Sequence, residues 1–298
     1  MRTTTQYVPH RKRRRKGYVL LMTMLAIALS SLALVGFASF SLNHAVETRM
    51  LKGELQQKWG AASIERVAFA NSDRLLNRTI VDRETGEQTH KPLRSQNAYF
   101  LLGEFEFAVS FEDESAKLDL NQVLKLSRSE AATESIIAEF VDFDGLPIFL
   151  RPLDAEFQRT KKEDALESWG QVFELSAGNA NAVGIRQATR ELTCWSSKMN
   201  YRTASDETLY EFCSLIGGQT AAGQLVSERQ RAPELPLETV LEEIHVSKRV
   251  QASLQSALVE SSHSQSVWIR VVGAGTKSDR FVVRESISGT ERFVSFQW

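Results

Sequence analysis

The sequence predicts an α+β protein that combines a long N-terminal helix, a small antiparallel sheet and an inserted group of helices. An apolar run at Tyr18–Leu42 continues, with apolar residues at helical spacing, as far as Leu76. Segments that alternate apolar and polar residues lie in the middle and at the end of the chain, and helical stretches separate them. Strands that are interrupted by helical blocks and followed by a run of strands are typical of the α+β class.

The N-terminal segment decides where the rest of the chain lies. A basic cluster, Arg11–Lys16, precedes the apolar run, and no charged side chain follows until Glu47. The apolar run spans about 25 residues, whereas roughly 20 suffice for a helix to cross a membrane. Because basic residues stay on the cytoplasmic side, we expect a single-pass protein of the inner (cytoplasmic) membrane. Its N-terminus would be cytoplasmic and its C-terminal domain periplasmic.

Three interpretations of this segment remain open. A cleaved secretory signal has a shorter apolar region, about 7–15 residues, which ends at a small-x-small site. Gly36–Ser39 could pass for such a site. An uncleaved signal anchor is the second interpretation, and the third depends on the junction Lys16-Gly17-Tyr18.

The helices and strands are expected in the following order. The first helix covers 18–76, with Asn71–Asn77 as its end, and Gly53 and Gly60 weaken it locally by up to about 1 kcal/mol each. Arg78–Gln96 is polar and predicts a loop or a weak hairpin, whereas Tyr99–Phe111 predicts one half-buried strand. Further helices are expected at Glu134–Val141, Asp164–Phe173, Ser205–Ile216 with Ser205 as N-cap, Ala221–Arg229 and Leu237–Ile244, and antiparallel strands at Val267–Val272, Arg280–Arg284 and Arg292–Trp298.

Charge and motifs exclude several functions. The formal net charge is −1, and residues 1–17 contain seven basic side chains and no acidic one, so the remaining chain has a side-chain charge of −8. Nucleic-acid binding requires a basic face, so we expect no nucleic-acid partner. The chain contains no Gly-x-Ser-x-Gly, phosphate loop or dinucleotide fingerprint, and we expect no enzyme activity. The five histidines are scattered without metal spacing, at His10, His44, His90, His245 and His263.

Two kinds of site depend on few residues. Oxygen ligands for Ca²⁺ could come from Glu112, Asp113, Asp142 and Asp144, although an Asp-x-Asp-Gly fragment is usually a solvated turn. No other cofactor is expected. The cysteines are Cys194 and Cys213, which in an exported chain favour a disulfide. The alternative is a pair of buried thiols.

A short pattern occurs twice. Ala116–Asn121 and Ser197–Ala204 both follow a strand, both carry Lys-apolar-Asx-apolar, and both precede helices. The short Asx side chains can bond their own backbone and turn a strand into the start of a helix. By composition alone this pattern is only a turn motif.

In this order, these features resemble the K-type minor pseudopilins of type II secretion, the general secretion pathway protein K family of type IV pilin-like proteins. The junction resembles a prepilin leader, which a membrane peptidase cuts after the Gly before methylating the new N-terminus. The resemblance implies cleavage between Gly17 and Tyr18 and N-methylation of Tyr18. Most pilins carry a Glu five residues after the cut, but this chain has Met22. K-type members usually lack that Glu, which suits a subunit at the tip.

The repeated pattern also resembles the family. Its members carry an Asp-Glu-x-x-Lys-apolar-Asn-apolar-Asn turn, a helical domain and a second Lys-apolar-Asn-apolar-Asn-Thr-Ala turn. Asp119 and Arg202 depart from the Asn of the family, and Pro147–Thr189 matches poorly, within a resemblance that runs from Lys12 to the C-terminus. The matching turn residues here are Lys117, Asp119 and Asn121 in the first turn and Lys198, Asn200 and Thr203 in the second.

The resemblance implies a pilin-type helix, a helical insertion similar to SAM or helix-hairpin-helix folds, and a structural role. The protein would cap the tip of a type II secretion pseudopilus and help to initiate its assembly for protein export. Its partners would be I- and J-type minor pseudopilins, the major pseudopilin and the prepilin peptidase. Alternatives are a membrane-anchored exported module that binds a ligand or protein, or a minor pilin of a type IV pilus. The domains expected are a leader (1–17), the long helix (18–76, with 18–42 transmembrane), the start of the α/β domain (77–121), a helical insertion (122–190), and a second helical unit with C-terminal strands (191–298).

Overall fold

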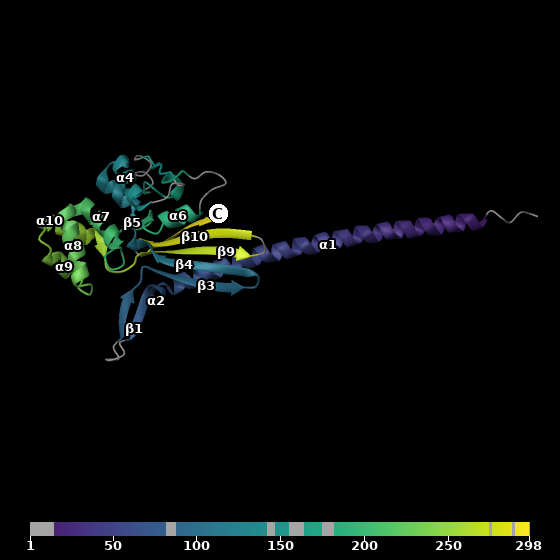
Figure 1. Ribbon diagram of the computed structural model, residues 1–298, viewed down its shortest axis with the longest axis horizontal. Helices are drawn as coiled ribbons and strands as arrows, with labels where there is room; N and C mark the ends of the chain where they lie inside the picture. The colour runs from purple at the N-terminus through teal and green to yellow at the C-terminus, as the bar shows by residue number, and fades with distance from the viewer. Residues whose placement is uncertain are drawn as a thin grey trace, which may run out of the picture. The chain divides into compact units, whose positions relative to one another are not determined.

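A computed structural model of the chain describes residues 15–81, 88–141, 147–154, 164–174, 182–273, 276–287 and 290–297 (Figure 1). The chain forms two compact units, Met1–Lys58 and Trp59–Trp298, and each is considered by itself. The predicted α+β class is confirmed, because a long N-terminal helix, a five-stranded antiparallel sheet and further helices are all present.

The N-terminal helix α1 runs from Arg15 to Ala70 without interruption, so Gly53 and Gly60 do not break it. A short helix α2 (Ser72–Leu76) follows after a turn at Asn71. The Asn71 side chain donates to the carbonyl of Val67 at 2.8 Å, and such local bonds compete with helix continuation. The end of the long helix thus lies at the start of the predicted end region, Asn71–Asn77, and the last residues of that region form the separate helix α2.

The main sheet has the strand order β11-β10-β9-β4-β3, and all neighbours are antiparallel. It is a simple meander with one very long connection, since residues 114–263 lie between the adjacent strands β4 and β9. Asp113 at the end of β4 is opposite Gln265 at the start of β9. The strands are β3 (Ser95–Leu102), β4 (Phe105–Asp113), β9 (Ser264–Gly273), β10 (Thr276–Ile287) and β11 (Thr290–Gln297).

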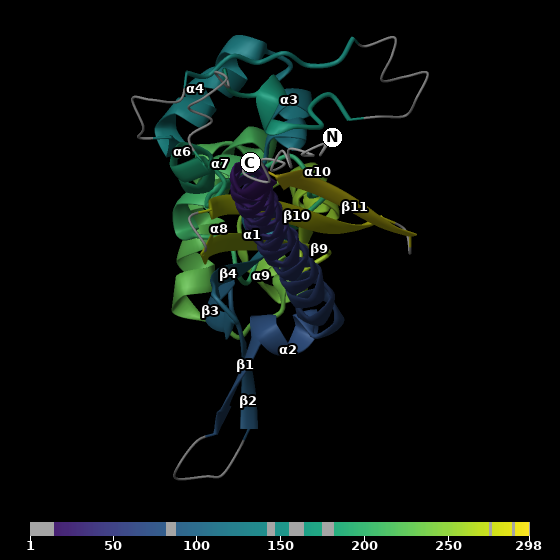
Figure 2. The same cartoon turned by 90° about the vertical axis from the view of Figure 1, so that its right-hand side faces the viewer.

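Both faces of this sheet are covered by apolar side chains. Phe107, Ile269 and their neighbours on one face pack with Ala61 and Phe69, from the last turns of α1. On the other face Trp268 belongs to a larger core that the inserted helices complete. The sheet is thus the middle layer of this unit. The last turns of α1 pack on one face, and the core of the inserted blocks packs on the other (Figure 2).

Gly60 allows the end of α1 to approach the sheet closely. A Cβ at this position would lie 2.5 Å from Cζ of Phe107, a ring that is 1% exposed. The glycine that weakens the helix locally is therefore required for packing on β4.

The insertion consists of two helical blocks of similar design. The first begins after β5 (Leu118–Asp119) and returns to β6 (Leu192–Thr193), which pairs with β5 in parallel. The second begins after β7 (Met199–Asn200) and returns to its parallel partner β8 (Leu258–Val259). The described helices are α3 (Leu120–Ser127), α4 (Glu130–Phe140) and α6 (Ala182–Ala188) in the first block, and α7 (Asp206–Gly217), α8 (Gln219–Arg231), α9 (Leu237–Glu243) and α10 (Lys248–Ala257) in the second.

Several local predictions are confirmed. Ser205 caps α7 by accepting the backbone N–H of Thr208, and α8, α9 and the three C-terminal strands lie where the sequence predicted them. The polar stretch before β3 contains the hairpin of β1 (Asn77–Val81) and β2 (Gln88–Pro92).

Other predictions were wrong. The single strand at Tyr99–Phe111 is a hairpin of β3 and β4, because Gly103 adopts a positive φ of 63° and turns the chain. Within Asp164–Phe173 the described regular structure is a 3₁₀ turn at Trp169–Gln171, not a helix. The helix α10 was not predicted.

Candidate functional site

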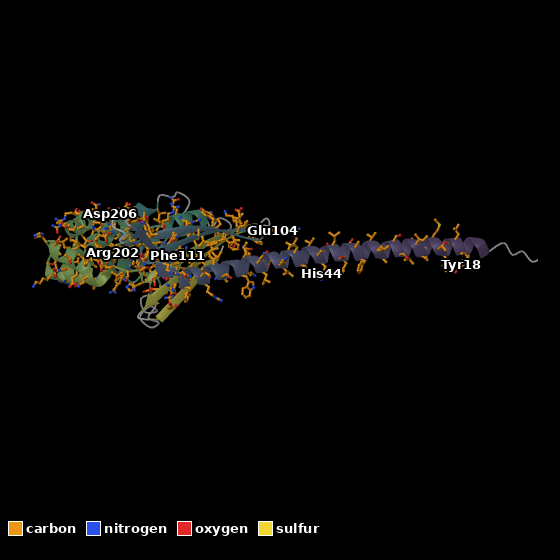
Figure 3. All side chains as sticks on the ribbon, turned by 90° about the horizontal axis from the view of Figure 1, so that it is seen from below. Tyr18, His44, Glu104, Phe111, Arg202 and Asp206 are labelled. Atoms are coloured by element: carbon orange, nitrogen blue, oxygen red, sulfur yellow. The ribbon has the colours of Figure 1, made fainter. Side chains whose placement is uncertain are left out.

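The N-terminal part of α1 exposes apolar side chains around its whole circumference. Tyr18 is 63% exposed and Met22 is 46% exposed, and Figure 3 shows Tyr18 and His44 pointing outward from the helix. Within the described residues, one helix, Tyr18–Ala70, is long and apolar enough to cross a membrane by length and composition. A surface of this kind requires lipid or other apolar helices around it. Gly17 also lies in α1.

A second candidate site is a cluster of buried polar side chains where the insertion leaves and rejoins the sheet. We call it the polar junction; its members are Glu112, Asp113, Glu114, Ser115, Lys117, Asp119, Asn200 and Thr203. β4 and the 3₁₀ turn Glu114–Ala116 position the first members, and β7 and the turn after it position the last two.

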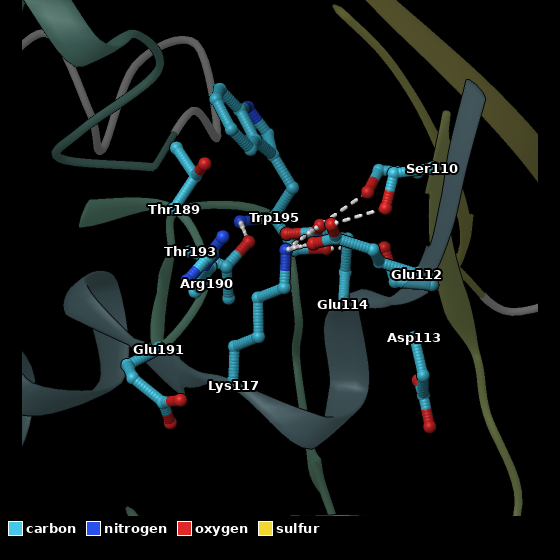
Figure 4. Close-up of polar contacts among 12 residues, drawn as sticks. Ser110, Glu112, Asp113, Glu114, Lys117, Thr189, Arg190, Glu191, Thr193 and Trp195 are labelled. Carbon is cyan, nitrogen blue, oxygen red and sulfur yellow. Dashed lines mark hydrogen bonds and ion pairs between the residues drawn. The ribbon is translucent and has the colours of Figure 1, made fainter. Parts of the chain in front are cut away.

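Lys117 is the centre of the polar junction. Its ammonium group lies 2.7 Å from Oε2 of Glu112 and 2.5 Å from Oε1 of Glu114, and its side chain is 1% exposed (Figure 4). Ser110 donates to Glu112 at 2.8 Å, and Ser266 donates to Glu114 at 2.5 Å. One buried cation thus links β4, the 3₁₀ turn and, through Glu114, the strand β9.

Asp113 brings the two repeated turns together. Its Oδ2 accepts from the Asn200 amide at 2.8 Å and from the Thr203 hydroxyl at 2.7 Å, while Oδ1 accepts from the Ser115 backbone N–H at 2.9 Å. Ser115 in turn accepts the backbone N–H of Ser264, at the start of β9. Asp113 therefore combines a local bond within its own turn with bonds to a segment almost ninety residues away.

Asp119 and Asn121 hold the first helical block. Asp119 caps α3 by accepting the N–H of Gln122 at 2.8 Å, and its other oxygen accepts the N–H of Ser196, also at 2.8 Å. Asn121 donates to the carbonyl of Cys194 at 3.0 Å. Both side chains therefore connect the start of this block with the chain that leaves it.

The charges of the polar junction are tuned by burial and by Lys117. Burial alone would raise the pKa of Glu112, but Lys117 outweighs it and the pKa is lowered. Burial would likewise lower the pKa of Lys117, but Glu112 and Glu114 raise it. Burial raises the pKa of Asp113 in spite of its hydrogen bonds from Thr203 and Asn200. The ion pair is thus stabilised in its charged form.

The shifted pKa of Asp119 is expected to make the stability of the fold depend on pH. Burial raises its pKa from 3.8 to about 8, against the two backbone N–H bonds that lower it. Because the folded pKa exceeds the unfolded one, the contribution of this group is fully present below pH 3.8 and is lost as the pH rises to about 8. Asp119→Asn removes the titration but loses one acceptor. We therefore expect the stability advantage of the native chain over the variant to shrink between about pH 5 and about pH 8.

Urea unfolding of the full chain in detergent micelles, followed by tryptophan fluorescence, measures this difference. At each pH, the free energy of unfolding of the variant is subtracted from that of the native chain, which removes the contributions of all other titrating groups. A difference that stays constant across this range would contradict the assignment.

The described half of the proposed calcium ligands does not fit a cation. The oxygens of Glu112 accept from Ser110 and Lys117, and those of Asp113 accept from other groups of the polar junction. No three His, Cys, Asp or Glu side chains among the described residues are grouped to hold a metal ion. Asp142 and Asp144 lie outside the described residues, so calcium binding stays a prediction that depends on them.

The cysteines do not form the expected disulfide. Cys194 and Cys213 are both free and buried, and they belong to the core of the inserted helices. Burial raises the pKa of the Cys213 thiol to about 12 and that of Cys194 well above its usual value, so neither forms a reactive thiolate. The structure corresponds to the alternative interpretation, in which the two thiols act as small apolar side chains.

The predicted turn residues differ in their environments. Asp113, Lys117, Asp119 and Asn200 meet in or beside the polar junction, whereas Lys198 is exposed although it is the counterpart of Lys117. The ion pair of Arg94 with Glu191, at 2.7 Å, was missed by sequence reasoning. Glu191 also accepts from Thr208 at the start of α7. No motif marks these residues; only their approach in the folded chain does.

Comparisons with known proteins gave a similarity to a solved structure. No family model matches the chain, and no curated protein sequence matches it. Among solved structures, the chain is similar to one in the crystal structure of the GspK-GspI-GspJ complex from the Type 2 Secretion System of enterotoxigenic Escherichia coli. The match has 15% sequence identity and a TM-score of 0.45, and it covers 85% of this chain and 98% of the other. At that identity and TM-score it is a similarity only, and no step of the functional proposal rests on it.

Proposed function

We propose that the protein is a K-type minor pseudopilin, a structural subunit of a type II secretion pseudopilus that is anchored in the inner membrane before assembly. Its partners would be I- and J-type minor pseudopilins and the major pseudopilin. The role requires packing and no catalysis. The observation that carries the proposal is α1, whose exposed apolar half begins at Tyr18, directly after the basic cluster and Gly17.

The physical argument concerns burial of α1. In the membrane its backbone hydrogen bonds are satisfied within the helix and lipid covers the apolar side chains. In a filament, apolar helices of other subunits would replace the lipid without exposing a polar backbone group. The same helix therefore suits both environments. Removal of residues 1–17 by a prepilin peptidase would delete the basic cluster that holds the N-terminus on the cytoplasmic side.

The insertion supports a position at the tip. Residues 114–263 form two helical blocks between neighbouring strands of the sheet, and the buried polar junction fixes where they leave it. A bulky, firmly attached insertion would prevent further subunits from stacking above this one. Met22, where other subunits offer a carboxylate, suits the same position.

Cleavage of the N-terminus provides the decisive test. After co-expression with a prepilin peptidase, we expect intact-mass analysis to give a chain that begins at an N-methylated Tyr18. Gly17→Ala is expected to block cleavage, whereas Gly36→Ala, which has no neighbour within 4 Å of the added Cβ, leaves it unchanged. Persistence of the full-length chain with native Gly17 would refute the proposal and favour a plain membrane-anchored module. Cleavage near Gly36–Ser39 would instead indicate a secretory signal.

A further inference from the structure

The edge strand β3 carries an exposed apolar patch on the sheet face that points away from α1. Tyr99 is 83% exposed and Leu101 is 74% exposed, and they are opposite Ala108 and Glu106 of β4. Val272 of β9, also opposite Glu106, is 44% exposed and extends the patch. Within the described part of the chain, β3 pairs only with β4. The helix α2 lies beside the start of β3, at Ser95–Asn97, and the outer edge from Tyr99 to Leu102 has no paired strand.

A cavity lies at the start of the same strand and on the same face. Its volume is about 250 Å³, and its lining includes Ser95 and Asn97 of β3 and Ser110 of β4. Side chains two residues apart on a strand share a face, so Asn97, Tyr99 and Leu101 form one row that begins at the cavity and ends on the patch.

The cavity has one net positive charge, since its four cationic side chains are opposed by Glu112 and Glu191 of the lining and by Glu114, which pairs with Lys117. Of its four cationic side chains, Arg94 is paired with Glu191 and Lys117 with Glu112. Arg186 on α6 and Arg190, one turn further, form no ion pair with any residue that the structure describes. Arg186 lowers the pKa of Glu112, but the oxygens of that carboxylate are bonded to Ser110 and Lys117. Two guanidinium groups beside hydroxyl and amide donors suit a carboxylate, with which arginine forms strong, directional hydrogen bonds.

We propose that this row binds an extended acidic-apolar segment of a partner protein as an additional strand. A carboxylate of the segment enters the cavity beside Arg186 and Arg190, and its apolar side chains cover Tyr99 and Leu101. Since one face of a strand repeats every second residue, about 6.6 Å apart, the segment reads Glu-x-apolar-x-apolar, or the reverse if antiparallel. Backbone pairing with an exposed edge is a general mode of peptide recognition. The proposal uses only the sheet and α6, so it stands independently of how the N-terminus is processed.

The test uses the full chain in nanodiscs of neutral phosphatidylcholine and fluorescently labelled six-residue peptides. The probes are Glu-Thr-Val-Thr-Val-Thr and its reverse, each with a version that carries Gln in place of Glu. By fluorescence anisotropy we expect one Glu peptide to bind at least about tenfold more tightly than its Gln version. The double variant Arg186→Gln, Arg190→Gln is expected to bind both versions equally.

Two further variants separate charge from apolar contact. Lys248→Gln, Arg249→Gln removes two exposed positive charges from α10 and is expected to retain the preference for Glu. Tyr99→Ser, Leu101→Ser is expected to weaken both versions to the same degree. The proposal is overturned if the native chain binds Glu and Gln peptides equally or binds neither at about 1 mM. It is also overturned if N-acetylglutamate competes as well as the peptide, because the cavity would then be a simple anion site.

Discussion

Replacing Lys117 by methionine is expected to lower the free energy of unfolding by about 3–5 kcal/mol. The substitution keeps most of the side-chain volume but leaves Glu112 and Glu114 without their shared counter-charge. Glu114 is fully buried, and its Oε2 already has no hydrogen-bond partner in the described structure. An uncompensated charge in such a place costs far more than the pair itself contributes.

The second repeat supplies a matched control for this prediction. Lys198 occupies the same place in the Lys-apolar-Asx pattern but is exposed, so Lys198→Met is expected to change the free energy of unfolding by less than about 0.5 kcal/mol. Combining Lys117→Met with Glu112→Gln and Glu114→Gln is expected to recover part of the loss, because no buried charge is then left unpaired. Urea unfolding in detergent micelles measures all three variants. Equal losses for the two lysine variants would contradict the charged state of the junction.

These two lysines also show the limit of the sequence pattern. Both turns were found from the spacing of Lys and Asx, and both begin a helical block after a two-residue strand. Yet only Lys117 is preceded by acidic residues that enclose it, Glu112 and Glu114, and the contact of Glu114 with Ser266 depends on β9, which lies far away in the sequence. Periodicity describes local geometry, whereas the role of a charge depends on which segments later cover it.

Much of the fold was predictable because its signals are local. The apolar run of α1, the alternation in β9, β10 and β11, and the Ser205 cap of α7 all appear within a few residues of sequence. The errors occurred where a single residue or a distant contact decides. Gly103 turns one apparent strand into a hairpin through its positive φ, and the stretch Asp164–Phe173 forms a 3₁₀ turn in place of the predicted helix.

The candidate sites divide in the same way. The apolar surface of α1 follows from composition, but the site at the row from Asn97 to Leu101 required the structure, since the arginines beside it come from α6 and the turn after it. The expected disulfide failed for a related reason. The number of cysteines and the cellular compartment limit what is chemically allowed, but the position of each thiol is set by the packing of the whole helical core.

The aromatic cluster around Trp195 should decide whether the insertion and the sheet unfold together. Trp195 is 2% exposed, and its ring lies 5.3 Å from that of Trp169 within the insertion. It also lies 5.7 Å from the ring of Phe281 in β10 and 5.5 Å from that of Phe296 in β11. We expect Trp195→Ala to lower the free energy of unfolding by about 3–5 kcal/mol, the usual cost of such a cavity in a core.

Trp195→Phe is expected to lower the free energy of unfolding by less than half as much as Trp195→Ala. The smaller ring retains part of the contacts, and it removes an indole N–H that is buried without a hydrogen-bond partner in the described structure. Trp59→Ala is the control, since that ring is 66% exposed. This control variant retains the same number of tryptophans as the Trp195 variants, so their fluorescence signals can be compared. The native chain, Trp195→Phe and Trp59→Ala are expected to unfold in one transition of the second unit, because the ring cluster joins both layers. A second transition in Trp195→Ala alone would still be consistent with coupling through this ring, whereas two transitions in the native chain would show that the insertion folds independently of the sheet.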